Sequence, residues 1–211
     1  MEDRFDHDPV PTRLIGAVLT GGLSSRMGQP KALLPHSTGG SFLSHAIQRM
    51  RQVTGEKVLL SLPKDDDQLP LSDGLLSSSS IIRIPDTLPN QGPAVGVWRC
   101  LLRAQVSGHA ACLFTPVDLP ELTATDLQEL VQVWQNDPEL IVVANDETEE
   151  RLQPLVAIYP RRCLPAIEGV VKSHHRSLYR HLQTQSFLRV DLPRASLRNV
   201  NSPDDLSSEP S

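Results

Sequence analysis

A glycine-rich, basic segment follows the first apolar run of the sequence. Residues 19–34 read LTGGLSSRMGQPKALL and include the adjacent glycines Gly21 and Gly22, then Arg26 and Lys31. Glycines without a Cβ atom allow backbone amides to approach an anion closely. Arg26 can neutralise phosphate oxygens through its planar fork and Lys31 as a point charge. The segment is therefore predicted to bind phosphate groups.

The spacing of this segment differs from two common phosphate-binding patterns. Five residues separate Gly22 from Gly28, and two more separate Gly28 from Lys31. Neither the G-x-x-x-x-G-K-[ST] loop nor the G-x-G-x-x-G dinucleotide turn has this spacing. A glycine-rich turn with solvated charges is the alternative interpretation. The position of the segment directly after a strand favours a binding role, because ligands of open α/β sheets bind just beyond the carboxyl ends of the strands.

The elements around this segment alternate between strands and helices. Short apolar runs bounded by turn residues predict strands at 14–19, 58–62, 81–84, 111–114 and 141–144. Apolar residues at three- and four-residue spacing predict helices over 42–53, 94–102 and 127–134, the last opened by a capping box of Thr123 and Asp126. This alternation is typical of an α/β fold with a doubly wound, mostly parallel sheet.

The rhythm of the sequence loosens after about residue 150. Strands are expected at 155–158 and 187–190, short helices at 163–171 and 177–183, and a further short helix from Ser202. An antiparallel strand near the C-terminus, at an edge of the sheet, is expected. A single domain is expected over 14–206, and 1–13 and 207–211 are expected to be tails, the first of them disordered.

Composition excludes several classes of protein. The chain has 211 residues, a net charge of −5 and no apolar run near the length of a membrane helix, so neither nucleic acid nor membrane is an expected partner. Its three cysteines are widely spaced in apolar surroundings, which argues against a disulfide framework and a zinc site and favours a reducing cytoplasm.

Residues 19–31, L-T-G-G-L-S-S-R-M-G-Q-P-K, closely resemble the signature of the MobA-like nucleotidyltransferases, the molybdenum cofactor guanylyltransferases. Four more segments resemble that family in the same order along the chain. They are Pro85-Asp86 with Gly92-Pro93-Ala94-Val95-Gly96, Thr115-Pro-Val-Asp118-Leu-Pro120, Arg176-Ser177-Leu178, and Asn199-Val-Asn201-Ser-Pro-Asp-Asp-Leu206.

This resemblance implies transfer of GMP from GTP to molybdopterin with release of pyrophosphate. It implies Arg26, Lys31 and Asp118 as catalytic residues, with Asp118 binding Mg²⁺, which prefers one or two carboxylates and completes its shell with phosphates and water. The nucleotide-binding residues that it implies are Leu19, Thr20, Gly21, Gly22, Lys31, Asp86, Gly92 and Asp118. Arg176, Asn199 and Asn201 would contact molybdopterin. An accessory GTPase and client molybdoenzymes are possible partners of such an enzyme.

Several alternatives remain open at the level of sequence. Gly21-Gly22 resembles the guanine form of the motif, but Thr20 replaces an alanine, Ala94-Val95 replaces Leu-Ala, and 61–64 lack the family's asparagine. CTP with the same pterin, a nucleotide with a sugar or polyol phosphate, or a nucleotide- or cofactor-carrying module without turnover are the alternatives. Lys172 and Arg180 flank Arg176 at roughly helical spacing, and a solvated helix face is the favoured interpretation of both.

Overall fold

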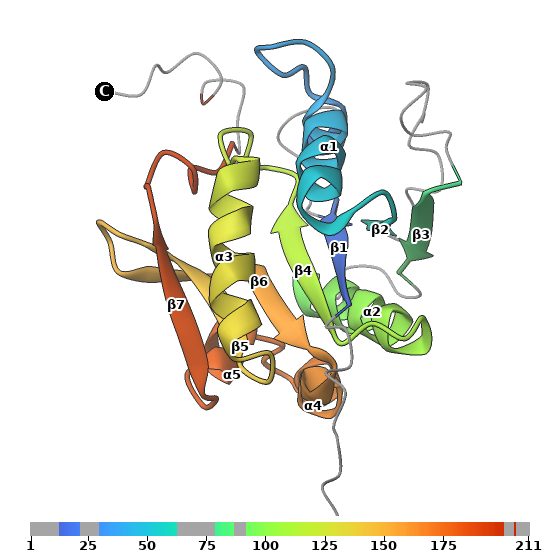
Figure 1. Ribbon diagram of the computed structural model, residues 1–211, viewed down its shortest axis with the longest axis vertical. Helices are drawn as coiled ribbons and strands as arrows, with labels where there is room; N and C mark the ends of the chain where they lie inside the picture. Colours follow the sequence, from blue (N-terminus) through green and yellow to red (C-terminus); the bar gives the residue numbers. More distant parts are fainter. Residues whose placement is uncertain (1–12, 22–29, 63–78, 87–91, 201–204, 206–211) are drawn as a thin grey trace, which may run out of the picture.

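The computed structural model describes residues 13–21, 30–62, 79–86, 92–200 and 205. These residues form one sheet with seven strands in the order β3-β2-β1-β4-β6-β5-β7 (Figure 1). The strands are β1 (Leu14–Leu19), β2 (Val58–Leu62), β3 (Ile81–Pro85), β4 (Ala111–Pro116), β5 (Ile141–Asp146), β6 (Arg151–Pro160) and β7 (Phe187–Leu192). The predicted strands are confirmed, and those after β2 extend beyond their apolar runs.

The sheet is mostly parallel, with one reversed strand. β6 pairs antiparallel with both β4 and β5, whereas β7 pairs parallel with β5. The predicted antiparallel strand near the C-terminus is therefore present, but its expected place at an edge is wrong. β6 follows β5 through the tight turn at 147–150, which reverses the chain and leaves β6 in the interior. The edge strand β7 runs parallel to β5 because two helices carry the chain back across the sheet.

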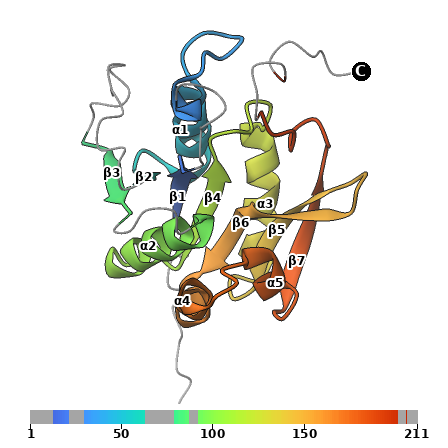
Figure 2. The same cartoon turned by 180° about the vertical axis from the view of Figure 1, so that it is seen from behind.

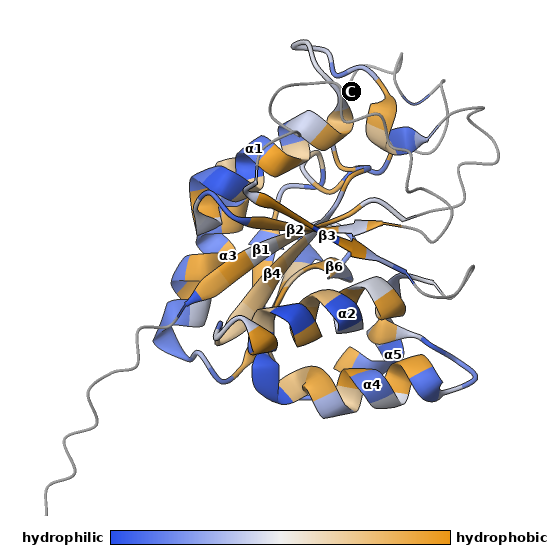
Figure 3. Ribbon diagram, turned by 90° about the vertical axis from the view of Figure 1, so that its right-hand side faces the viewer, coloured by the Kyte–Doolittle hydropathy of each residue, from blue (hydrophilic) through white to orange (hydrophobic). Residues whose placement is uncertain are grey.

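Helices cover both faces of the sheet, as Figures 1 and 2 show from opposite sides. The α-helices are α1 (Phe42–Thr54), α2 (Pro93–Val106), α3 (Ala124–Asn136), α4 (Leu164–Lys172) and α5 (Leu178–Leu182), with short 3-10 helices η1 (Lys31–Leu33) and η2 (Arg161–Cys163). One buried core includes residues of α1 and α3, and the other includes residues of α2, α4 and α5. Figure 3 shows the sheet between these two helical layers, so the doubly wound prediction is confirmed.

Local signals placed several of these helices correctly. Thr123 and Asp126 form the predicted capping box at the start of α3, with Asp126 N donating to Thr123 Oγ1 (3.1 Å) and Thr123 N donating to Asp126 Oδ2 (2.7 Å). Trp134, near the end of α3, is fully buried as expected from its apolar face. None of the helices in the described ranges is both long and apolar enough to cross a membrane.

Some predictions fall on parts of the chain outside the described residues. Apart from Arg13 the two expected tails lie there, and so does the helix expected from Ser202, except for Asp205. The boundaries 14–206 of the domain therefore stay a prediction.

Close contact between α2 and the sheet depends on Gly96. A Cβ atom at this position would lie 2.6 Å from Ser61 Oγ in β2 and 3.4 Å from Leu19 Cδ2 in β1. The first distance is too short, so something must shift if a side chain is added. The helix that follows Gly92 is thereby held against the carboxyl ends of two central strands.

We expect Gly96→Ala to lower the free energy of unfolding by about 1–3 kcal/mol, the usual cost of overpacking. Ser61→Ala should restore most of this loss in the double variant, because the next Ser61 atom, Cβ, lies at an ordinary 3.5 Å from the added methyl group. Denaturant unfolding of the two single variants and the double variant measures this. Additive losses would contradict the proposed contact.

Candidate active site

The carboxyl ends of β1 and β4 bring two predicted segments together. Leu19 pairs with Pro116 in the parallel register of these strands, and Val117 N donates to Leu19 O (3.1 Å). Gly21 follows β1 and is exposed, and apart from its chain neighbours no atom of the described residues lies within 4 Å of where its Cβ would be. The start of the glycine-rich segment and the Asp118 segment therefore lie side by side, at the edge that we call the carboxyl edge.

Lys31 and Asp118 meet at the carboxyl edge. Lys31 Nζ lies 3.3 Å from Asp118 Oδ2, with side-chain exposures of 14% and 24% respectively. Lys31 opens η1, while Asp118 lies in the loop after β4. Both charges are largely withdrawn from bulk solvent but still reachable from it. The sequence predicted that both residues face one site, and the structure brings them into contact across 87 positions of the chain.

Thr20 is tied to the neighbouring strand by its side chain and its backbone. Thr20 Oγ1 and Thr20 N donate to the Ser61 carbonyl oxygen at 2.7 and 3.2 Å. Thr20 is only 8% exposed and Ser61 only 4%. Because its proton is used in this bond, the Thr20 hydroxyl can only accept a further hydrogen bond. The departure from alanine at this position thus adds a fixed polar group beneath the carboxyl edge.

Asp86 lies at the same edge, immediately after β3. Its N–H donates to Leu62 O (2.7 Å), which joins it to the end of β2. Its Oδ1 atom is buried and has no hydrogen-bond partner among the described residues. Burial raises the pKa of Asp86, and the nearby Arg99 of α2 opposes this rise only in part. A buried acceptor without a donor is costly unless something else supplies the donor.

Arg99 was not among the residues predicted for the site. It lies on α2 and acts on Asp86 through its charge. The sequence carries a weak signal for it, because Arg99 follows the Asp86 segment on a helix whose first turn was already assigned to the site. Sequence spacing alone does not tell which side of that helix meets the end of β3.

The raised pKa of Asp86 predicts a pH-dependent stability. Since the pKa is higher in the folded than in the unfolded state, the folded state binds more protons between the two values, and the free energy of unfolding falls as pH rises through that window. At pH values above the folded-state pKa, the ionised Asp86 lowers the free energy of unfolding by its full amount. We therefore expect Asp86→Asn to melt at a higher temperature than the wild type at pH 7.

That advantage should disappear at about pH 3, where the wild-type Asp86 carboxyl group is mostly protonated in both the folded and the unfolded state. Thermal melts at the two pH values measure the difference. Asp137→Asn, a change at an exposed aspartate at the end of α3, is the matched control. An equal advantage of Asp86→Asn at both pH values would contradict the assigned cause.

Gly92 caps the N-terminus of α2 with a conformation that favours glycine. Its φ is 74° and ψ is 175°, and within the described ranges no side-chain hydrogen bond caps this end of the helix. Pro93 follows as the first helical residue, where a missing N–H costs nothing. The open N–H groups of the first turn and the helix dipole favour an anion here. This agrees with the predicted nucleotide contact at Gly92, which itself stays a prediction.

The segment that contains Asn199 packs against the Asp118 loop. Val200 is buried, and its N–H donates to Asp118 O (2.9 Å). Asn199, the residue before it, is exposed. The C-terminal segment therefore reaches the carboxyl edge, as the resemblance implied. Asn201 lies outside the described residues.

Arg176 lies between α4 and α5 with an unusual backbone. Its φ is +38°, which is uncommon for a large side chain, and its N–H donates to Ser173 Oγ (3.2 Å). Strained residues of this kind often mark functional positions. Lys172 ends α4 and pairs with Glu168 (2.8 Å), whereas Arg180 lies in α5. The three basic residues thus do not share one helix, because residues 173–177 between α4 and α5 are not helical.

Two further predicted residues, Gly22 and Arg26, lie outside the described residues. Their predicted contacts with phosphate are therefore stated only as proposals below.

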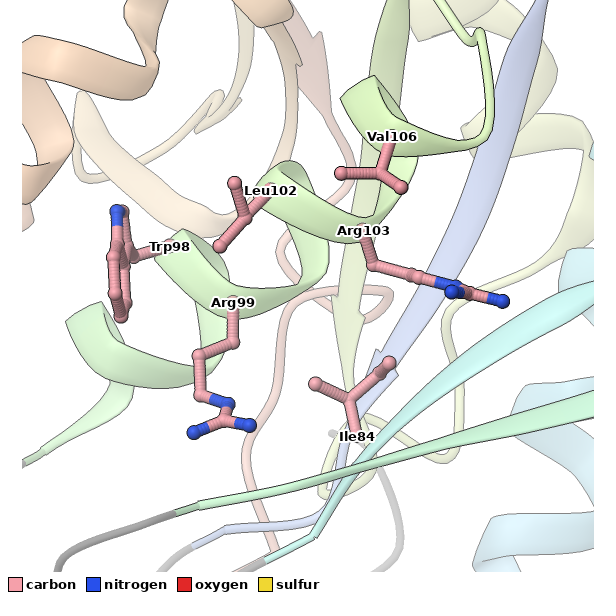
Figure 4. A pocket seen from close by; sticks show the side chains of 6 residues that line it. All are labelled: Ile84, Trp98, Arg99, Leu102, Arg103 and Val106. Atoms are coloured by element: carbon pink, nitrogen blue, oxygen red, sulfur yellow. The ribbon is translucent and has the colours of Figure 1, made fainter.

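Two hollows of the described surface are lined by none of the predicted site residues, although Arg99 lines the first of them. One, of about 330 Å³, lies on the flank of α2 beside β3, where Trp98, Leu102 and Val106 contribute apolar surface (Figure 4). The other, of about 800 Å³, includes Ala110 at the start of β4 and Pro160 at the end of β6, so it lies at the opposite edge of the sheet. Neither contains a residue predicted for catalysis.

In the comparison with protein families, a model described as the MobA-like NTP transferase domain matches residues 16–189. The chain belongs to this family. The match starts within β1 and ends within β7, so it includes every strand of the sheet.

Relatives of this MobA-like chain cover nearly its whole length. A protein of Rhodopirellula baltica named "Probable molybdenum cofactor guanylyltransferase" is 48% identical over 200 residues, which are 93% of this chain and 91% of that protein. The crystal structure of molybdopterin-guanine dinucleotide biosynthesis protein A from Archaeoglobus fulgidus aligns with a TM-score of 0.70 and 19% identity, over 91% of this chain and 94% of the other.

A Mycobacterium tuberculosis protein, crystallised in complex with manganese, aligns with a TM-score of 0.63 and 14% identity, over 86% of this chain and 89% of the other. At this level of identity, the two structural similarities confirm the fold alone. The relative at 48% identity carries the comparison of activity.

Proposed function

We propose that this protein transfers GMP from GTP to molybdopterin and releases pyrophosphate, which forms molybdopterin guanine dinucleotide. The observation that carries the proposal is the contact of Lys31 with Asp118 at the carboxyl edge, directly beside the exposed Gly21. The name of the relative at 48% identity supports guanine as the base and the molybdenum cofactor as the acceptor.

The residues at the carboxyl edge fit a magnesium ion bound mainly by its substrate. Among the described residues there is no group of three or more His, Cys, Asp or Glu side chains that could hold a metal. Asp118 is a single accessible carboxylate, and Mg²⁺ is often bound by one or two carboxylates with phosphate and water as the other ligands. When bound, such an ion would neutralise phosphate charge. The manganese complex of the structural neighbour supports a divalent ion in this fold.

The protein's own groups would position two anionic substrates against each other. The terminal phosphate of molybdopterin attacks the α-phosphorus of GTP, the bond to the β-phosphate oxygen breaks, and pyrophosphate leaves. Such a displacement needs alignment and charge neutralisation more than a protein nucleophile. We assign the phosphate oxygens to Lys31, Arg26 and the amides of Gly21 and Gly22, with the N-terminus of α2 at Gly92 as a further donor.

The guanosine would lie against the ends of β1, β2 and β3. Asp86 Oδ1 is a buried acceptor whose donor is not supplied by the described residues, and the N–H groups of guanine or a ribose hydroxyl would supply one. The Thr20 hydroxyl is fixed as an acceptor at the end of β1. Leu19 contributes backbone rather than side chain, because its side chain is packed in the core.

Molybdopterin would approach from the side of the C-terminal segment. Asn199 adjoins the Asp118 loop through the Val200 contact, and Asn201 is assigned with it. Arg176 supplies a positive charge from its strained turn. A cytoplasmic reaction, an accessory GTPase and client molybdoenzymes belong to the same proposal. Cys100, Cys112 and Cys163, all buried as free thiols, support a reducing compartment.

Nucleotide-dependent thermal protection tests the choice of base. A ligand that binds only the native state raises the melting temperature, and at a hundred times its Kd it adds about 2.7 kcal/mol to the free energy of unfolding. We expect stronger protection by GTP than by CTP, and a larger difference when magnesium is added. Stronger protection by CTP would overturn the assignment of guanine.

Pyrophosphate release separates an enzyme from a carrier module. The mixture of GTP, magnesium and molybdopterin should release pyrophosphate in step with loss of GTP. Tight GTP binding without release would favour a nucleotide-carrying module instead. The same assay with sugar phosphates in place of molybdopterin tests the alternative acceptors.

A further inference from the structure

Arg49 is a buried cation that the proposed chemistry does not use. It lies in α1 and is only 9% exposed. Burial lowers the pKa of Arg49 to about 10, a shift that the charges of Asp126 and Glu121 oppose. The guanidinium is still charged at neutral pH. A charge buried in this way needs fixed acceptors, or it destabilises the fold.

The acceptors of Arg49 lie in the segment that contains Asp118. Arg49 Nη1 donates to the Pro120 carbonyl oxygen (2.9 Å) and to the Leu122 carbonyl oxygen. His36 Nε2 lies 3.4 Å from the same Pro120 oxygen. Arg49 Nε and Nη2 are buried without a hydrogen-bond partner among the described residues. The guanidinium is therefore anchored through one nitrogen to two carbonyl groups of one loop.

Contacts on both sides of Asp118 hold this loop in place. Val117 N donates to Leu19 O at the start of the loop, and the Asp118 carbonyl oxygen accepts from Val200 N. Leu119 and Leu122 are buried. Arg49 supplies the fixed point on the other side of Asp118, two and four residues along the chain. Arg49 therefore anchors the segment that follows Asp118.

We propose that Arg49 is a positioning residue, which fixes residues 118–122 so that the Asp118 carboxylate faces Lys31 and the phosphates of the nucleotide. The inference rests on the proposed function only for the identity of the reaction. Lysine cannot replace arginine here without displacement, because its Nζ is one bond short of the position of Nη1. A displacement of about 1 Å at a reacting group can cost up to about a hundredfold in rate.

The test compares Arg49→Lys with Arg51→Lys, a matched change on the same helix. Arg51 hydrogen-bonds Ser80 Oγ, at the start of β3, rather than the Asp118 loop. Amide exchange of Val200 is measured by NMR without nucleotide, relative to the amide of the buried Leu113 in β4. In Arg49→Lys we expect the relative exchange of Val200 to rise about tenfold, the effect of weakening one hydrogen bond. In Arg51→Lys it should not change.

Kinetics provide the second readout through a double-mutant cycle with Asp118→Asn. Arg49→Lys should lower kcat/KM about 10–100-fold in the wild-type background and less than about threefold in the Asp118→Asn background, because coupled residues are not additive. Equal effects in both backgrounds, or unchanged Val200 exchange in Arg49→Lys, would overturn the proposal. If the wild type shows no guanylyl transfer, the proposed function fails, while the exchange result still decides whether Arg49 fixes the loop.

Discussion

Asp118→Asn is expected to lower kcat for guanylyl transfer by about a thousandfold or more, because it removes the charge that we propose to hold Mg²⁺ while preserving the size of the side chain. The fold should survive, since the core contacts of the loop come from Leu119 and Leu122 and its carbonyl still accepts from Val200. Asparagine also loses the ion pair with Lys31, whose Nζ lies 3.3 Å away. Steady-state release of pyrophosphate measures the effect.

Glu121→Gln is the matched control for Asp118→Asn. It removes a carboxylate charge from the same loop at an exposed position, three residues further along the chain. We expect its kcat to lie within about threefold of the wild type, as for most surface substitutions away from a site. Full turnover in Asp118→Asn, with a normal melting temperature, would remove Asp118 from the metal site.

Lys31→Met is expected to lower kcat/KM for GTP by about a hundred- to a thousandfold, the usual cost of removing one preorganised charge from a developing anion. Methionine matches the apolar length of lysine, so the packing around η1 should persist. In the nucleotide-free protein Lys31 is held by Asp118. In the proposed function Asp118 would hold Mg²⁺ and the Lys31 ammonium group would contact the phosphates of GTP.

A matched lysine far from the site separates the loss of Lys31 itself from the loss of one positive charge on the protein. Lys57→Met removes a positive charge just before β2, at the opposite edge of the sheet, and should leave kcat/KM unchanged. Binding of mant-labelled or radiolabelled GTP, measured alongside turnover for each variant, distinguishes weaker binding from a slower chemical step. A turnover of Lys31→Met equal to that of Lys57→Met would contradict the assigned role.

Much of the fold was predictable because the central strands are apolar on both sides. β1 and β2 have the predicted boundaries, since turn residues stop both apolar runs abruptly. β6 was predicted as 155–158 but spans Arg151–Pro160, because its first residues pair with β5 although Arg151 and Gln153 interrupt the apolar pattern. Its interior position depends on tertiary pairing, which local patterns do not report.

The candidate site was predictable wherever strand ends determined it. Asp118, Asp86 and Gly21 all follow parallel strands, so topology alone sends them to one edge. Contacts through helices were harder to predict. Arg49 occupies an apolar-face position of α1, seven residues after Phe42 and three after Ala46, and this was the signal that a buried cation was present. Its partner loop could not be known from periodicity, because 71 positions separate Arg49 from Pro120.

The most direct measurement combines the purified protein with GTP, molybdopterin and magnesium and follows both products by mass spectrometry. We expect molybdopterin guanine dinucleotide and pyrophosphate in equal amounts, with formation of both slowed about a thousandfold or more in Asp118→Asn. Formation of the cytosine dinucleotide from CTP at a higher kcat/KM than the guanine product from GTP, or of neither product by wild-type protein, would contradict it.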